Sequence, residues 1–269
     1  GEAVVPFEIE KKLRAKHTLL GVHNIVLFAM SGIDMAAWDA LAQAQGLPLV
    51  SLLGGAPRPI LAYNSKGLGI MPLKALAKEA RELVAEGFGA IKLRLGRAQA
   101  KDDLAALRAV KKAIGPDITL MVDFNQGLSV AQALERGRLI DAEGGVHWIE
   151  EPVRADDFAG NARLAREIAT PIQIGENFMG PEQMAQALAA QACDYVMPDV
   201  QRIGSFNVVF VLSGSIPPAA PAAFAACESY IESFFSDPMT ITVNVSFQVL
   251  SPGVLGSTGG WLPDGSGMV

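Results

Sequence analysis

Between about residue 59 and residue 199, two patterns of apolar and polar residues alternate along the chain. Short apolar runs of strand length alternate with longer segments whose apolar residues recur at the spacing of an amphipathic helix. We expect strands at 60–64, 90–95, 119–123, 146–150, 172–175 and 195–199, and helices at 73–86, 101–114, 131–141, 160–168 and 181–191. Strands that alternate with helices in this way predict an α/β fold built on a parallel sheet.

The even spacing of these βα steps favours a closed barrel over an open sheet. An open sheet that binds dinucleotides would carry a glycine-rich turn after its first strand, and this sequence has none there. We therefore predict a barrel of the TIM type, in which the carboxyl ends of all strands lie on one face.

The flanking segments differ from the regular middle of the chain. Residues 1–56 have a helical pattern, clearest at 32–45, where Gly46 and Pro48 follow as stop signals. Beyond Gly204 the regular alternation of strand and helix patterns stops. Residues 208–212 still have the pattern of a seventh strand, and apolar and polar residues alternate at 240–250 as in a strand. We predict a helical capping remainder at 1–56, a barrel domain at 57–250 and a tail at 251–269 that returns to the cap.

Composition narrows the class of protein. Hydrophobic residues make up 50% and charged residues 19% of the 269, so the chain can bury a large core. A net charge of −6 argues against nucleic acid as a partner. The only cysteines, Cys193 and Cys227, fit a reducing compartment. No apolar run reaches the roughly 18 residues of a membrane span, so we expect a cytoplasmic protein without a membrane partner.

Three of the expected strands end at a carboxylate. Asp123, Glu150 and Glu176 each follow an apolar run and are separated from one another by about one βα unit. On the carboxyl face of a barrel they would come together as three hard oxygen ligands, which suit Mg²⁺. The alternative is that each acid is an ordinary loop residue at a strand end, but three in register favour the metal site.

The motifs around these acids resemble those of the mandelate racemase-like group of the enolase superfamily. The matching segments are 31–41, 48–54, 122–126 (Val-Asp-Phe-Asn-Gln), 148–152 (Trp-Ile-Glu-Glu-Pro), 175–177 (Gly-Glu-Asn) and 197–199 (Met-Pro-Asp). The resemblance implies a (β/α)₇β barrel capped by an α+β domain, present here in part. It also implies one Mg²⁺ held by Asp123, Glu150 and Glu176, and a reaction that begins by removing the proton α to a carboxylate to give an enediolate.

In the family the second strand carries a Lys-x-Lys motif, which here is Lys92-Leu-Arg94. The resemblance implies that Lys92 contacts the substrate carboxylate and takes part in catalysis. Arg94 stands where the second base is expected. Because an arginine pKa is near 13, using its neutral form at pH 7 would cost roughly 8 kcal/mol, so Arg94 is better interpreted as an electrostatic clamp. The alternative is a pair of solvated cations at a strand end.

Other residues resemble functional positions of the family within shorter matching stretches. Asp199 matches the acid that ends the sixth strand, but the histidine that the family pairs with it is absent from the expected place. Ser65 and Asn125 match positions that contact substrate oxygens, and Glu232 matches an eighth-strand acid that donates a hydrogen bond to the substrate carboxylate.

These observations predict a Mg²⁺-dependent racemase or acid-sugar dehydratase that acts on a small carboxylic acid. A different class remains open: a non-catalytic relative that keeps the metal site but has lost its acid/base pair, as the Arg94 substitution and the missing histidine would suggest. A third interpretation, in which the barrel serves only in assembly, is less favoured. The even, apolar helices suit a homo-oligomer.

Overall fold

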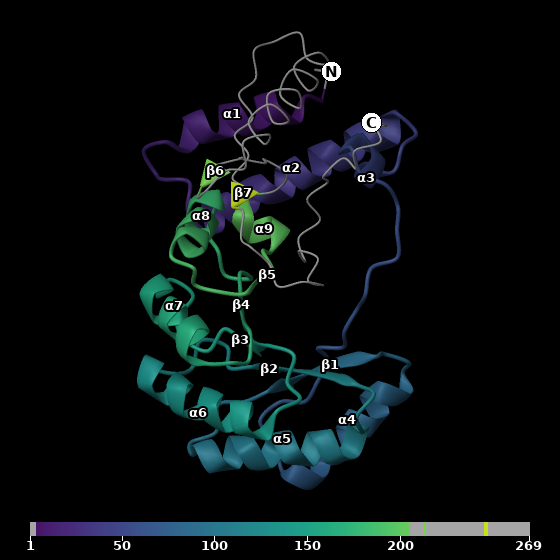
Figure 1. Ribbon diagram of the computed structural model, residues 1–269. Coiled ribbons are helices and arrows are strands. Elements are labelled where there is room, and N and C mark those ends of the chain that lie inside the picture. Colours follow the sequence, from purple (N-terminus) through teal and green to yellow (C-terminus); the bar gives the residue numbers. More distant parts are fainter. Residues whose placement is uncertain (1–3, 205–211, 214–244, 247–269) are drawn as a thin grey trace, which may run out of the picture. The chain divides into compact units, whose positions relative to one another are not determined.

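The computed structural model describes residues 4–204, 212–213 and 245–246. The chain separates into two compact units, Gly1–Phe206 and Asn207–Val269, and Figure 1 traces their elements. The first unit contains the capping helices and the βα repeats. The domain limits expected from the sequence stay predictions.

A parallel sheet is the centre of the first unit. Its strands are β1 (Ala90–Arg94), β2 (Thr119–Asp123), β3 (Ile149–Glu150), β4 (Ile172–Ile174) and β5 (Tyr195–Val196). They are hydrogen-bonded in the order β1-β2-β3-β4-β5, and each neighbouring pair is parallel. Sequential parallel strands are the arrangement expected for part of a βα barrel.

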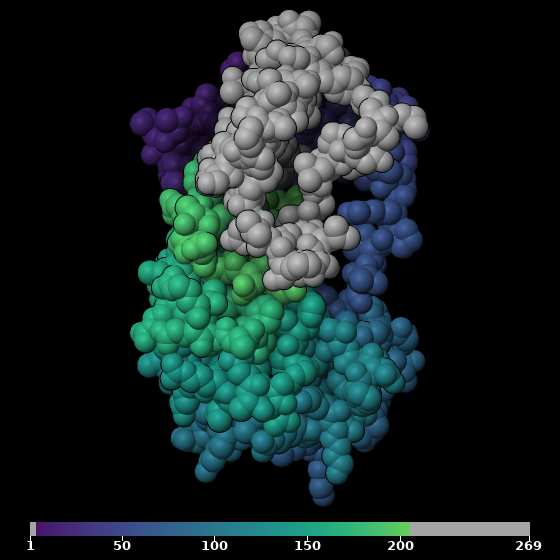
Figure 2. All heavy atoms as spheres, viewed as in Figure 1, coloured from purple at the N-terminus to yellow at the C-terminus, as the bar shows by residue number. Residues whose placement is uncertain are grey.

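Helices connect these strands and pack against their neighbours in sequence. They are α4 (Leu73–Ala85), α5 (Ala100–Ile114), α6 (Val130–Glu143), α7 (Phe158–Glu167) and α8 (Pro181–Ala189). Helix α4 shows why they fold onto the sheet, since its buried Leu76, Ala80 and Leu83 recur at helical spacing on one face. Burying a side chain such as leucine contributes about 1.5–3 kcal/mol. Figure 2 shows that side chains fill the spaces between the ribbons of the blue to teal elements.

The expected first strand at 60–64 is wrong. Only Asn64 pairs with β1, through an isolated parallel bridge to Ile91, and residues 55–62 run extended and exposed (Figure 1). Ile60 and Leu61 are 81% and 100% exposed. The apolar run predicted a strand, but a strand needs a buried face as well as apolar residues. Strands β3 and β5 are likewise shorter than expected.

Three helices form the capping part of this unit: α1 (Pro6–His17), α2 (Asn24–Ala44) and α3 (Leu49–Leu52). Helix α2 begins earlier than the sequence pattern predicted. By length and composition alone, α2 is long and apolar enough to cross a membrane, with a mean hydropathy of 1.5. The sequence pattern did not predict a segment of this kind. Within the described residues α2 buries Leu27, Met30, Asp34 and Trp38, and 39% of its apolar window is buried.

A short helix, α9 (Val200–Ile203), follows β5, and in the second unit β6 (Leu212–Ser213) pairs in parallel with β7 (Val245–Ser246). Strand β6 overlaps the expected strand 208–212 at Leu212, and β7 falls within the expected strand 240–250. The rest of those strands, the 251–269 tail and Glu232 lie outside the described residues.

Candidate active site

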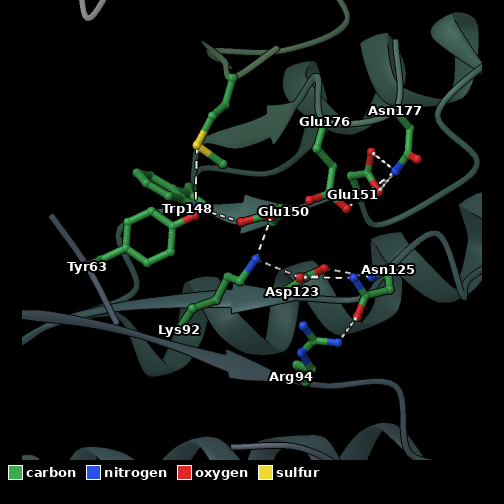
Figure 3. A network of polar contacts seen from close by, with 11 residues as sticks. Tyr63, Lys92, Arg94, Asp123, Asn125, Trp148, Glu150, Glu151, Glu176 and Asn177 are labelled. Carbon is green, nitrogen blue, oxygen red and sulfur yellow. Dashed lines mark hydrogen bonds and ion pairs between the residues drawn. The ribbon is translucent and has the colours of Figure 1, made fainter. Parts of the chain in front are cut away.

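The carboxyl ends of β1, β2 and β3 bring together one lysine and two carboxylates. The sheet register places Asp123 opposite Glu150. The ammonium nitrogen of Lys92 lies 2.9 Å from Asp123 Oδ2 and 2.7 Å from Glu150 Oε1, and the three side chains are 6%, 1% and 0% exposed (Figure 3). The two acids therefore share one buried ammonium group, whereas the sequence predicted that they share a metal ion with Glu176.

Electrostatics keep Lys92 charged in this arrangement. Desolvation by burial, the largest single contribution, lowers the pKa of Lys92, but Glu150 and Asp123 together outweigh it and raise the pKa above its usual value. For Glu150 the largest contribution is burial, which raises the pKa of its carboxyl group, while the hydrogen bond from Lys92 opposes that rise.

The second oxygen of Glu150 has a different partner. Trp148 Nε1 donates a hydrogen bond of 3.2 Å to Glu150 Oε2. The Trp148 ring meets the Tyr63 ring edge to face at 5.7 Å, and Lys92 Nζ lies 5.9 Å from the centre of that same Tyr63 ring. The sequence interpretation missed both aromatic residues. The available signal for Trp148 was its place two residues before Glu150, which puts it on the same face of the chain.

Glu176 enters the site through a turn that only glycine allows. Gly175 has φ 141°, and a Cβ atom on it would lie 2.8 Å from the backbone of Met197. Glu176 follows directly and points from the end of β4 towards Glu150 (Figure 3).

Beside the half-buried Glu176 lies a further acid, Glu151, which is fully buried. Both of its oxygens accept hydrogen bonds from Asn177 Nδ2, at 2.8 and 2.7 Å. Burial and the neighbouring carboxylates of Glu176, Asp123 and Glu150 raise the pKa of Glu151 to about 7, against the lowering effect of Asn177. The site thus holds more carboxylates than cations.

Of the remaining expected residues, Arg94 and Asn125 are linked to Asp123 by hydrogen bonds, whereas Ser65 and Asp199 make no hydrogen bond or ion pair with this centre among the described residues. Arg94 is exposed, and its Nη1 lies 3.4 Å from Asn125 Oδ1. Asn125 takes a left-handed conformation (φ 44°) and donates to Asp123 from its backbone nitrogen at 2.8 Å and from Nδ2 at 3.1 Å. Ser65 is exposed beyond Asn64. Asp199 caps α9 by accepting a 2.7 Å hydrogen bond from Gln201 N.

The donor chemistry of the centre fits a hard divalent cation. Within residues 4–204 and the two short strands beyond, no three His, Cys, Asp or Glu side chains lie close enough together to hold one ion as they stand. The carboxylates of Asp123 and Glu150 both contact the ammonium group of Lys92. Glu176 adds a third carboxylate to the same group of acids. Hard carboxylate oxygens around a surplus of negative charge suit Mg²⁺. The three-ligand set stays a prediction.

Comparison with known proteins agrees with the motifs. Residues 75–210 match the enolase C-terminal domain-like family, and residues 4–54 match the N-terminal domain of the mandelate racemase/muconate lactonizing enzymes. A curated relative, the L-talarate/galactarate dehydratase of Salmonella typhimurium, is 35% identical over 207 residues, which cover 75% of this chain and 52% of the relative. This chain thus spans about half the length of that relative.

Solved structures give the same result. An enolase from alpha pretobacterium bal199 with bound Mg is 49% identical with a TM-score of 0.73, over 77% of this chain and 58% of that one. The L-talarate dehydratase from Polaromonas sp. JS666, complexed with Mg and L-glucarate, is 30% identical with a TM-score of 0.72, over 86% and 62%. These relatives have a TIM barrel with a capping domain, which confirms the predicted fold class. The chain belongs to the mandelate racemase/muconate lactonizing enzyme family of the enolase superfamily.

Proposed function

We propose that this protein is a Mg²⁺-dependent enzyme that removes the proton α to the carboxylate of a small hydroxy acid, by way of an enediolate. The observation that carries the proposal is the convergence of Asp123 and Glu150 on one buried positive charge at the ends of adjacent strands. A buried surplus of carboxylates costs stability unless a cation uses it.

In this proposal Asp123, Glu150 and Glu176 hold the Mg²⁺. When bound, the ion supplies positive charge next to the substrate carboxylate, where negative charge develops as the α-proton leaves. Asn125 keeps Asp123 in place through its two hydrogen bonds. Asp123 needs this support because a ligand carboxylate that can rotate binds its ion less tightly.

The cationic side chains of the site hold and act on the substrate. Lys92 reaches the centre from β1 and contacts the substrate carboxylate, as a catalytic residue. Arg94, with Asn125 beside it, binds a substrate oxygen at the exposed edge. Ser65 adds a further polar contact, and Asp199 and Glu232 complete the proposed catalytic set.

An acid sugar is the substrate class that the relatives favour. Among them, the L-talarate/galactarate dehydratase and the arabinonate dehydratase are 35% and 31% identical, whereas an L-Ala-D/L-Glu epimerase is 27% identical. Dehydration needs one base and one acid to help hydroxide leave, whereas racemisation needs a base on each face of the α-carbon. Lys92 is the one buried lysine among the described residues, and it would act as the single base of a dehydration only when its ammonium group no longer pairs with Asp123 and Glu150. We also propose that the protein is cytoplasmic and forms a homo-oligomer.

Incubation of the full chain with Mg²⁺ and a panel of acid sugars in D₂O tests the reaction. Release of a 2-keto acid supports dehydration, and deuterium at the α-carbon with inversion supports racemisation. Lys92→Ala should abolish either signal, whereas Glu143→Gln on α6, a half-buried residue that pairs with Arg108 and Lys111, should leave it unchanged. Mg²⁺ binding with neither signal would favour the non-catalytic relative, and failure to bind Mg²⁺ would refute the proposal.

A further inference from the structure

Trp148 lies just before β3 and reaches the oxygen of Glu150 that Lys92 leaves free. We propose that Trp148 is a positioning residue for the Glu150 carboxylate: its indole N–H holds Oε2, so that Oε1 faces Asp123 and the cation they share. This inference rests on the proposed function and names a residue that fixes the geometry of its metal site.

The two oxygens of Glu150 have separate partners on opposite sides. Oε1 lies 2.7 Å from Lys92 Nζ, the same nitrogen that lies 2.9 Å from Asp123 Oδ2. Oε2 lies 3.2 Å from Trp148 Nε1. One donor on each oxygen fixes the rotation of the carboxylate about its last bond. If a divalent cation were bound between Asp123 and Glu150, the Trp148 hydrogen bond shown in Figure 3 would keep Oε1 directed towards it.

The indole donor is itself held in position. Its ring lies 5.7 Å from the rings of Tyr63 and Tyr195 and 5.1 Å from that of His147. The carbonyl oxygen of Trp148 accepts a 3.1 Å hydrogen bond from the backbone nitrogen of Val122 in β2. Ring contacts and backbone together prevent the indole from swinging away, so its N–H is a donor of fixed direction.

The neutrality of the indole matters for its role. A lysine or arginine at this place would also orient Glu150, but it would neutralise the carboxylate and repel a divalent cation nearby. An indole N–H donates one hydrogen bond, accepts none and carries no charge. It therefore orients the ligand while leaving the full negative charge of Glu150 for the metal.

A second tryptophan in the same unit provides a matched control. Trp38 on α2 is buried, and its ring packs edge to face on Phe7 at 5.2 Å. Its Nε1 has no hydrogen-bond partner among the described residues. Replacing either tryptophan with phenylalanine removes an indole N–H, but only at Trp148 is a hydrogen bond to a carboxylate lost.

Calorimetric titration of Mg²⁺ into the full chain tests the inference. We expect Trp148→Phe to weaken Mg²⁺ binding by about 10-fold or more, the effect usual for residues that orient metal ligands. Trp38→Phe should change it less than about twofold. Equal binding by wild type and Trp148→Phe overturns the inference but not the proposed function. No binding by the wild-type chain overturns both.

Two further measurements guard against a folding defect in Trp148→Phe. Replacing Trp148 by benzothienylalanine, in which sulfur stands for the indole N–H, keeps the ring shape and should weaken Mg²⁺ binding as much as phenylalanine does. In the ¹⁵N-labelled protein, Mg²⁺ should shift the indole resonance of Trp148, identified by its loss in the variant, and not that of Trp38. Wild-type affinity in the sulfur analogue, or an unmoved Trp148 resonance, overturns the inference.

Discussion

Two buried charged clusters in the first unit differ in how their charges are matched. In the cluster around Asp103 on α5 both oxygens of the carboxylate are paired: Oδ1 accepts from Gly96 N at 3.0 Å and Arg97 N at 2.9 Å, and Oδ2 accepts from Arg136 Nε at 2.9 Å. Arg97 Nη1 also lies 3.6 Å from Oδ1, so one carboxylate faces two guanidinium groups. Arg136 also donates to the carbonyl oxygen of Arg97 at 2.8 Å. This cluster ties the loop after β1 to α5 and α6, which is a structural role.

The active-site cluster has the opposite balance. Lys92 is shared between Asp123 and Glu150, while Glu151 and Glu176 add further acidic groups. Burial raises the pKa of both Glu150 and Glu151, which shows that the fold holds these carboxylates in an unfavourable setting. Burial of charge alone therefore does not distinguish the two clusters, whereas the sign of the surplus does: the candidate site holds more carboxylates than cations.

The largest expected effect is on stability, at Asp103. Asp103→Asn leaves the guanidinium of Arg136 buried without its anion, so the free energy of unfolding should fall by about 3–5 kcal/mol. Urea denaturation measures the change. Mg²⁺ affinity of the folded variant should stay within about threefold of wild type, because the cluster contacts no proposed ligand. A loss of less than about 1 kcal/mol would contradict the structural role.

The matching change in the active site should act on metal binding instead. Asp123→Asn should weaken Mg²⁺ binding at least 100-fold, or about 2.7 kcal/mol, because one of three anionic ligands is gone. The free energy of unfolding without metal should change by only about 1 kcal/mol, since Lys92 keeps Glu150 and repulsion among the acids falls.

Denaturation with and without Mg²⁺ checks both parts of this prediction. Saturating Mg²⁺ should raise the unfolding midpoint of the wild-type chain, as any ligand that binds only the folded state does, and leave that of Asp123→Asn unchanged. If Asp123→Asn unfolds as readily as Asp103→Asn, the two clusters do not differ in the way described.

The active-site cluster was partly predictable, because two of its carboxylates lie at the ends of strands. The positions of Asp123 and Glu150 follow from the apolar runs before them and from the rule that parallel strands end on one face. The βα helices were also found within a few residues, because their apolar faces repeat at helical spacing. Such features are local, so a sequence carries them directly.

Features that depend on distant contacts were not predictable in this way. Asp103 has the pattern of an exposed acid in the first turn of a helix, yet it is 3% exposed because Arg136, on the next helix, meets it. Likewise, the spacing from Trp148 to Glu150 puts both residues on one face of the chain but does not show that the indole N–H reaches the carboxylate. The apolar run at 60–64 does not show that only Asn64 pairs with a neighbouring strand. These outcomes depend on which elements become neighbours in the fold.

The smallest effect is expected at an exposed ion pair, which sets a baseline for both buried clusters. Glu143 Oε2 on α6 lies 2.7 Å from Arg108 Nε, whose side chain is 62% exposed, and Lys111 lies nearby. The Arg108 hydrogen bond, the largest contribution, lowers the pKa of Glu143 from its usual 4.5. Because the folded-state pKa is depressed, this pair stabilises the fold above the unfolded-state pKa, and the stabilisation is lost as the pH falls through the folded-state value.

Glu143→Gln should therefore lower the free energy of unfolding at pH 7 by only about 0.5 kcal/mol, since water and salt screen exposed pairs. The difference from wild type should shrink in about 1 M salt, where screening acts within about 3 Å, and disappear as the pH drops below the folded-state pKa. Urea denaturation at pH 7 and pH 3 measures it. A loss near that of Asp103→Asn would show that burial does not separate strong from weak charge pairs in this protein.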